Sequence, residues 1–109
     1  MKLIYSIVHD EDSPRVMSEL NKGGYRVTKL NSSGGFLRSG NTTLMTVVED
    51  DEVKPALEII RKYSSSRKAA VNTNVSPSGT SGTYTPYPVE VNIGGATVFV
   101  TNVEYFEKM

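Results

Sequence analysis

The spacing of hydrophobic and polar positions predicts a strand, a helix and a second strand within the first 30 residues. A nearly continuous apolar run over 3–8 is rich in β-branched and aromatic side chains, as in a central strand covered on both faces. Ser13 and Pro14 supply an N-cap and a proline for the first helical position, and the apolar stripe behind them stops at the glycine pair 23–24. Apolar and polar residues then alternate over 25–30, which indicates a half-exposed strand.

A third strand and a second helix are expected further along the chain. Residues 42–49 form an apolar-rich segment that predicts a strand. Apolar residues then recur at helical spacing over 53–63, which predicts an amphipathic helix. The acidic run 49–52 places negative charge where the helix dipole favours it. Pro55 is compatible with this helix if the cap lies near Glu52, because the proline then falls in the first turn.

Two segments have the composition of loops, and two strands are expected after them. The shorter loop is 31–41. The longer is 64–86, in which sixteen of 23 residues are Ser, Thr, Asn, Gly or Pro. Structureless stretches beyond about 12–15 residues in a compact domain are usually functional or disordered. Strands over 89–93 and 96–103 flank the glycine pair 94–95, which predicts a tight hairpin.

The order of these elements predicts a single α+β domain over 1–109. It runs strand, helix, strand, strand, helix, long loop, strand, strand. This is the ferredoxin-like βαββαβ plan with one extra C-terminal strand, in which two helices cover one face of a sheet. The plan hosts many unrelated functions, so function has to come from particular residues.

Composition narrows the classes of function. The 109 residues contain no cysteine, which excludes a disulfide scaffold, a thiolate metal site and a cysteine nucleophile. Twelve Lys and Arg balance twelve Asp and Glu, and this neutrality argues against a general nucleic-acid binder, whose affinity comes from neutralising phosphates. No apolar run reaches the ~20 residues of a membrane span, and the apolar N-terminal stretch lacks a cleavage site. We therefore expect a cytoplasmic protein without membrane insertion.

The sequence offers no arrangement typical of a catalytic or metal site. His9 is the only histidine, and its neighbours at a strand end do not form a triad, so it is interpreted as a surface residue at a turn. The acidic run 49–52 is explained by helix capping. The segment 35–42 has the glycine spacing of a phosphate-binding loop but lacks its lysine. We expect no enzymatic activity, no metal and no cofactor.

The segment 31–41 carries the most informative chemistry. Phe36 and Leu37 are large apolar residues in a polar loop, so they either pack under the loop or against another subunit, or form a platform for a flat ligand. Adjacent glycines let backbone N–H groups approach a phosphate, and an amide can pair with the edge of a base. Spacing alone leaves both interpretations open and slightly favours a nucleotide-type ligand. The other contacts to such a ligand would come from Arg26, Thr28, Gly35 and Asn41.

Four blocks of sequence carry a resemblance to a known family. They are RVTKL at 26–30, GGFLRSGNTT at 34–43, PYPVEV at 86–91 and GGATVFV at 94–100. The opening strand and the turn over 9–13 fit as well, so the likeness covers nearly the full chain. The chain resembles the PII-like cyclic di-AMP receptors of the PstA (DarA) family.

The resemblance implies a non-enzymatic signal-transduction protein that binds cyclic di-AMP. It implies a homotrimer with one ligand site in each cleft between neighbouring subunits, a short loop at 31–41, a long loop at 64–86 and an unidentified downstream protein partner. By the same resemblance, Phe36 stacks on an adenine and Leu37 packs beside it. Polar or backbone contacts come from Arg26, Thr28, Gly35 and Asn41, while Phe99 either lines the cleft or belongs to the core.

Departures from the family pattern leave a second ligand open. Val47 stands where relatives commonly have Gly, and a branched side chain there can crowd the ligand. Further departures are the segment 76–79, Asn92 and the helix end at 22–24. The alternative is a PII-like binder of ATP or ADP. An RNA-binding module shares the strand and helix order, but it requires aromatic residues on central strands and a basic surface.

Overall fold

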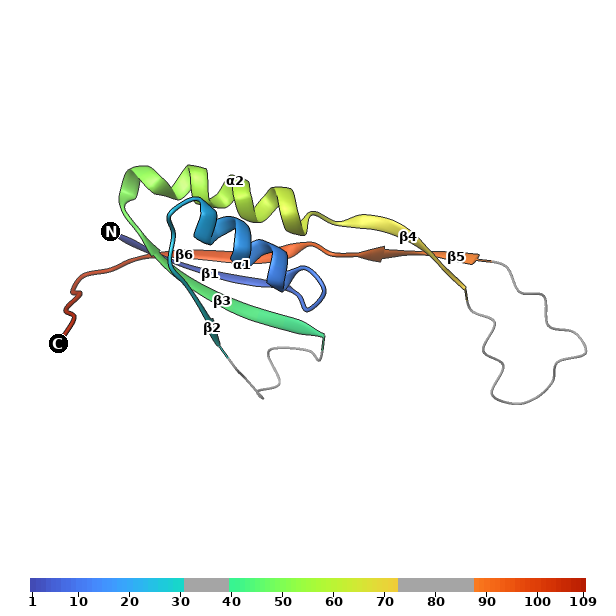
Figure 1. Cartoon of the computed structure of the whole chain (residues 1–109), viewed down its shortest axis with the longest axis horizontal. Coiled ribbons are helices and arrows are strands. Elements are labelled where there is room, and N and C mark those ends of the chain that lie inside the picture. Colours follow the sequence, from blue (N-terminus) through green and yellow to red (C-terminus); the bar gives the residue numbers. More distant parts are fainter. Residues whose placement is uncertain (31–39, 73–87) are drawn as a thin grey trace, which may run out of the picture.

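Two helices lie on one face of a four-stranded antiparallel sheet (Figure 1). The computed structural model describes residues 1–30, 40–72 and 88–109. The sheet has the order β2-β3-β1-β6, and all neighbouring strands are antiparallel. Its strands are β1 (Lys2–His9), β2 (Val27–Leu30), β3 (Asn41–Val48) and β6 (Ala96–Asn102). The helices are α1 (Ser13–Lys22) and α2 (Val53–Ser64), with the short 3-10 helix η1 (Asp50–Glu52) before α2. This α+β arrangement is compatible with the expected ferredoxin-like fold.

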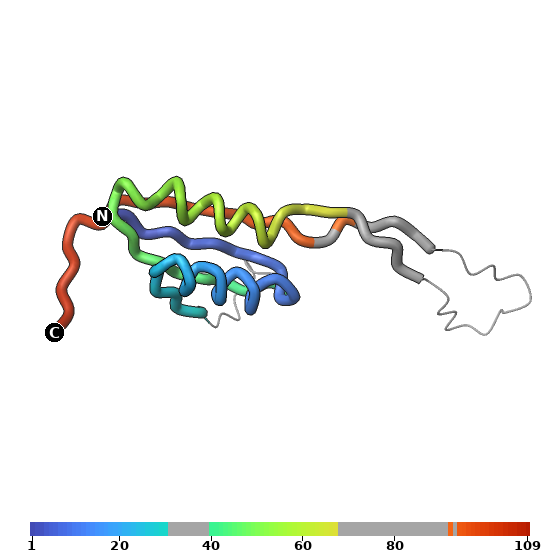
Figure 2. Tube along the Cα trace, turned by 45° about the horizontal axis from the view of Figure 1, so that its top comes forward, coloured from blue at the N-terminus to red at the C-terminus, as the bar shows by residue number. Residues whose placement is uncertain are grey.

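A second, two-stranded sheet extends from one end of the core. It pairs β4 (Arg67–Asn72) with β5 (Pro88–Ile93) in antiparallel register, and we call these two strands the arm. The arm leaves the core at the end of α2 and returns into β6 (Figures 1 and 2). The prediction of one long loop over 64–86 was therefore wrong for its first part. The abundance of Ser, Thr, Gly and Pro across the whole segment hid the five residues 67–71, which contain none of them.

The predicted hairpin at the glycine pair was also wrong. Gly94 and Gly95 have φ angles of 81° and 94°, as a tight hairpin turn requires. However, β5 pairs with β4, and β6 pairs with β1, so the glycines bend the chain between two sheets instead of reversing it. The strand that completes the core sheet is consequently β6, and the strand expected over 89–93 belongs to the arm.

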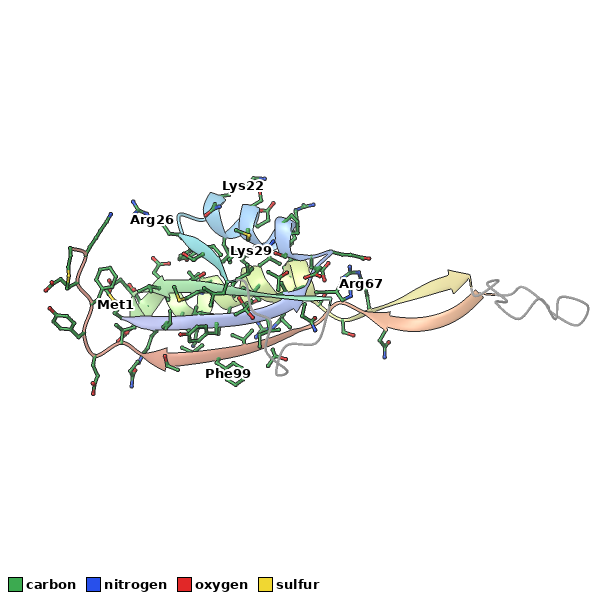
Figure 3. The ribbon with its side chains drawn as sticks, turned by 90° about the horizontal axis from the view of Figure 1, so that it is seen from below. Met1, Lys22, Arg26, Lys29, Arg67 and Phe99 are labelled. Carbon is green, nitrogen blue, oxygen red and sulfur yellow. The ribbon has the colours of Figure 1, made fainter. Side chains whose placement is uncertain are left out.

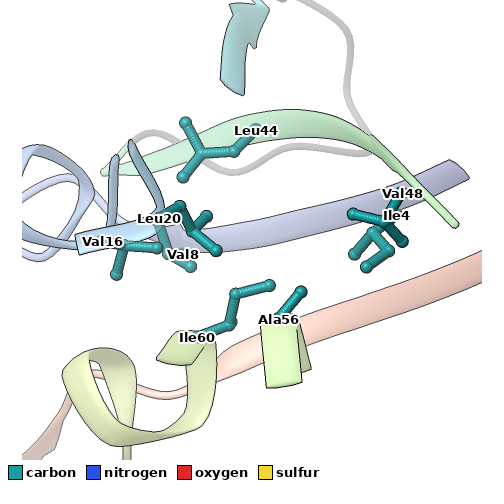
Figure 4. Packing of buried hydrophobic residues seen from close by; sticks show 8 residues of the cluster. All are labelled: Ile4, Val8, Val16, Leu20, Leu44, Val48, Ala56 and Ile60. Carbon is teal, nitrogen blue, oxygen red and sulfur yellow. The ribbon is translucent and has the colours of Figure 1, made fainter. Parts of the chain in front are cut away.

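The hydrophobic core lies between the sheet and the two helices (Figure 4). Along β1, every second residue points to the helices and is buried, because side chains alternate between the two faces of a strand. The buried apolar residues are Ile4, Val8, Val16, Leu20, Leu44, Val48, Ala56 and Ile60. Both helices present one apolar side to this layer, as their sequence spacing predicted.

The opposite face of the sheet carries apolar side chains that no described helix covers. Leu3, Tyr5 and Ile7 alternate with the buried residues of β1 and are only partly buried. In the register of the sheet, Tyr5 stands opposite Met45 on β3 and opposite Phe99 on β6. We call this the open face. The first strand was expected to be covered on both faces. Within one chain, only the face toward the helices is covered.

The start of α2 agrees with the prediction, and the start of α1 differs from it by one residue. Glu52 occupies the N-cap position of α2, and Pro55 lies in its first turn, as predicted, although the Glu52 carboxylate makes no capping hydrogen bond. Helix α1 begins at Ser13 with Asp12 at the cap, one residue earlier than predicted. The carboxylate of Asp12 makes no capping hydrogen bond and instead pairs with Arg67, 2.9 Å away.

Candidate ligand-binding site

A pocket of about 530 Å³ lies beside β2, where the turn after α1 meets β3. Two of the predicted ligand contacts, Arg26 and Thr28, line it together with Val47. The other lining residues are Met1, Gly23, Gly24, Tyr25, Met45, Val48, Glu49, Glu52 and Phe106. Grooves of about 550 and 530 Å³ lie elsewhere on the described surface, so volume does not single out this pocket. Of these three sites, only this pocket contains residues predicted as ligand contacts, Arg26 and Thr28.

The strand register explains how these side chains come together. Thr28 on β2 stands opposite Met45 on β3, so both lie on the open face. Val47 follows two residues later on the same side of β3 and faces Leu3 of β1. Arg26 precedes β2 and is exposed at the edge of the sheet (Figure 3). A guanidinium at the rim and an apolar floor suit a ligand that has an anionic group and a flat, weakly polar part.

Tyr25 fixes the turn that presents Arg26. Its phenol donates a hydrogen bond to Glu52 Oε2 at 2.5 Å, and its backbone N–H donates to the carbonyl of Leu20 at 3.0 Å. A Cβ atom at Gly23 would lie 3.1 Å from the Tyr25 ring and 3.1 Å from Ile59 Cδ1, so both side chains would have to shift by a few tenths of an ångström to accommodate a larger residue. The hydrogen bond to Glu52, followed by burial and the carboxylate charge, raises the pKa of Tyr25 to about 12.

The raised pKa predicts a loss of stability in alkaline solution. A group whose pKa rises on folding stabilises the protein below its unfolded value, 10.0 here, and loses that effect as the pH approaches about 12. As the pH rises from 10.0 to about 12, we expect the urea midpoint of the wild type to fall relative to the midpoint of Tyr25→Phe. Urea unfolding of both proteins across this range measures the difference. A constant difference at all pH values would contradict the assignment.

Asn41 lies at the other end of the open face. It is exposed at the start of β3 and stands opposite His9 of β1. Four residues of extended chain separate it from Met45, about 14 Å at the usual rise of a strand. The structure thus places Asn41 on the same face as Thr28 but outside the pocket lining.

Phe99 lies at the opposite edge of the sheet from Arg26 (Figure 3). It is 46% exposed on β6, and β1 and β3 separate it from Thr28. Three steps between neighbouring strands correspond to about 14 Å. Within one chain, Phe99 therefore does not reach the pocket that contains Arg26 and Thr28. The predicted contacts Gly35, Phe36 and Leu37 lie outside the described residues.

A comparison with protein families identifies the chain. The model of a family described as "Cyclic-di-AMP receptor" matches residues 1–109. The chain belongs to the cyclic-di-AMP receptor family. Membership of this receptor family supports a signalling protein that binds cyclic di-AMP, and it suggests binding instead of catalysis.

A solved structure resembles this cyclic-di-AMP receptor family member along nearly its whole length. It is the crystal structure of a functionally unknown protein from Pediococcus pentosaceus ATCC 25745, with 39% sequence identity and a TM-score of 0.76. The match covers 99% of this chain and 96% of the other. The similarity supports the α+β arrangement described above.

Several pocket residues of this receptor family member were not predicted from the sequence. Tyr25 and Glu52 act through a contact between residues 27 positions apart, and no local pattern indicates such a pair. Phe106 comes from the segment after β6, which begins with a hydrogen bond from Val103 N–H to the Met1 carbonyl. The only sequence signal for Phe106 is an aromatic pair, Tyr105 and Phe106, outside any predicted element.

Two further observations concern the described part of the chain. It contains no group of three or more His, Asp or Glu side chains that could hold a metal ion. None of its helices is long and apolar enough to cross a membrane.

Proposed function

We propose that the chain is a non-enzymatic, PII-like signalling protein of the cytoplasm that binds cyclic di-AMP in clefts between the subunits of a homotrimer. The full length, 1–109, would act as one domain. Binding would change the conformation of the segments 31–41 and 64–86 and thereby the surface offered to a downstream protein. The observation that carries the proposal is the match of the receptor family to residues 1–109, with Arg26 and Thr28 in one pocket.

The position of Phe99 supports a site shared between subunits. Phe99 and Thr28 lie on the same open face but at opposite edges of the sheet. If both contact one ligand, Phe99 has to come from a neighbouring chain. Two chains that meet edge to edge would bring β6 of one beside β2 of the other, and the ligand would lie between them.

The open face supports association of the chain with copies of itself. Its central side chains are apolar and partly buried, and Phe99 is 46% exposed. Contiguous apolar surface on a folded chain typically marks an interaction site. Covering this face with neighbouring subunits would also complete the two-sided burial that the apolar run over 3–8 predicts. Sedimentation equilibrium of the purified protein should give three times the mass of the chain.

The pocket chemistry fits an adenine dinucleotide. Such a ligand carries two anionic phosphates, which suit the guanidinium of Arg26, and two flat bases, which suit the apolar wall of Met45 and Val47. Thr28 offers a hydroxyl that can donate to or accept from a base edge. Asn41, about 14 Å further along the face, would contact a second part of an elongated ligand.

Val47 decides between cyclic di-AMP and the alternative ligands ATP and ADP. Its branched side chain lines the pocket and reduces the space beside the β3 backbone. We expect Val47→Gly to bind cyclic di-AMP more tightly while its affinity for ATP changes less. Parallel calorimetric titrations of both proteins with both ligands measure this ratio. Val8→Ala, at a buried core position outside the pocket lining, serves as a control for lost stability. If the ratio of the two affinities is the same in both proteins, Val47 does not determine the choice of ligand.

Calorimetry of the unmodified protein tests the proposed function itself. Saturable binding of cyclic di-AMP near one ligand per chain, with weaker binding of ATP, ADP and cyclic di-GMP, is the expected result. Tighter binding of ATP or ADP would establish the alternative. No binding of any nucleotide by the folded protein would overturn the proposal.

A further inference from the structure

The turn over 9–12, between β1 and α1, is fastened to the start of β3. The backbone N–H of Asp10 donates to the carbonyl of Gly40 at 2.8 Å. The hydroxyl of Thr42 donates to Asp10 Oδ1 at 2.5 Å. Asp10 thus holds the residues on both sides of Asn41. Asp10 is therefore a positioning residue for Asn41, the predicted ligand contact, although Asp10 itself does not line the pocket.

The other end of the same turn is fastened to the base of the arm. The two terminal nitrogens of Arg67 approach the two carboxylate oxygens of Asp12, at 2.9 and 3.4 Å. The side chain of Asp12 is only 8% exposed, so this ion pair is partly shielded from water. Arg67 also donates to the carbonyl of Ser65 at 3.3 Å, which ties the guanidinium to the chain leaving α2.

Gly94, directly after the other strand of the arm, leaves room for this ion pair. A Cβ atom there would lie 2.5 Å from Arg67 Nη1 and 2.8 Å from the Ser65 carbonyl. The N–H of Gly95 donates to the carbonyl of Ser64. Both strands of the arm are therefore anchored at the point where Arg67 meets Asp12. The turn itself is closed by a hydrogen bond of 2.9 Å from Asp12 N–H to the carbonyl of His9.

We propose that the turn over 9–12 is a rigid connector that couples the position of the arm to ligand binding at the start of β3. Asp10 holds Asn41 at one end of the connector, and Asp12 holds Arg67 at the other. The coupling to ligand rests on the proposed function; the anchoring of the arm by Arg67 does not. Because coupling between two sites is reciprocal, a change at the base of the arm has to change the affinity of the ligand site.

The first test measures affinity after a change that leaves the pocket intact. Arg67→Gln removes the charge of the ion pair, and we expect about fivefold weaker binding of cyclic di-AMP, the lower end of typical coupling between sites. Thr42→Val, which removes the hydrogen bond to Asp10, should weaken binding in the same direction. Arg61→Gln is the matched control, because Arg61 pairs with Glu58 within α2, whereas Arg67 pairs with Asp12 of the turn. Equal affinities for wild type, Arg67→Gln and Arg61→Gln would overturn the coupling.

The second test measures the position of the arm without any ligand. The chain has no cysteine, so Lys54→Cys on α2 and Asn92→Cys on β5, both exposed positions, accept a pair of spin labels cleanly. The labelled protein should show a narrow distance distribution that broadens with Arg67→Gln and not with Arg61→Gln. An unchanged distribution with Arg67→Gln would contradict the anchor. If the wild type fails to bind cyclic di-AMP, the proposed function fails, and this distance measurement still decides the anchor.

Discussion

Replacement of Arg26 by alanine is expected to weaken the binding of cyclic di-AMP about 10- to 100-fold. Hydrogen bonds to charged groups contribute about 1.5–3 kcal/mol, and about 1.4 kcal/mol corresponds to a factor of ten in affinity. Arg26 is exposed at the rim of the pocket, so its removal leaves the packed core untouched. The loss should therefore appear in ligand affinity and not in the unfolding midpoint.

The experiment for Arg26 needs a control that separates a specific contact from general charge. Arg61→Ala removes the same positive charge from an exposed site on α2, away from the pocket. Calorimetric titration of the three proteins at one salt concentration gives the comparison, because exposed charges are screened by salt. Equal affinities for Arg26→Ala and wild type would show that the phosphates of the ligand do not contact this guanidinium.

Replacement of Ile60 by alanine should cost about 2–5 kcal/mol of stability, the usual range for removing a buried Ile side chain. Ile60 is 1% exposed and packs between α2 and the sheet with Ala56 and other core residues. The neighbouring Ile59 is only partly buried, so Ile59→Ala is the matched control and should lose clearly less. Urea unfolding at a fixed protein concentration measures both, since association shifts apparent stability. If both variants lost a similar free energy of unfolding, Ile60 would not be part of the core as described.

The core of the fold could be predicted from the sequence because its signals are local. The apolar run of β1 and the stripe of α2 each act over a few residues, and the structure confirms both elements, with Glu52 at the N-cap of α2 as predicted. The arm could not be predicted in the same way. Gly94 and Gly95 have the backbone angles of a hairpin, but which strands pair around them depends on contacts with β1 and β4 far away in the chain.

The candidate site could be predicted only in part. Arg26 and Thr28 were singled out from one strand and its start, and they line one pocket. The contact between Tyr25 and Glu52 depends on how the second helix is placed, and no spacing in the sequence indicates it. Phe99 was predicted to line the cleft between subunits or to belong to the core, and sheet order places it at the opposite edge from Arg26 and Thr28 within one chain. Strand order is a tertiary property, so a list of suitable residues does not say which of them can meet within one chain.

A crystal structure of the protein with cyclic di-AMP is the most direct test of the central claim. The account predicts the ligand in a cleft between two subunits, with one phosphate near Arg26 and a base beside Thr28 of one subunit, and with Phe99 contributed by its neighbour. A ligand held within a single chain, or bound away from Arg26 and Thr28, would contradict it.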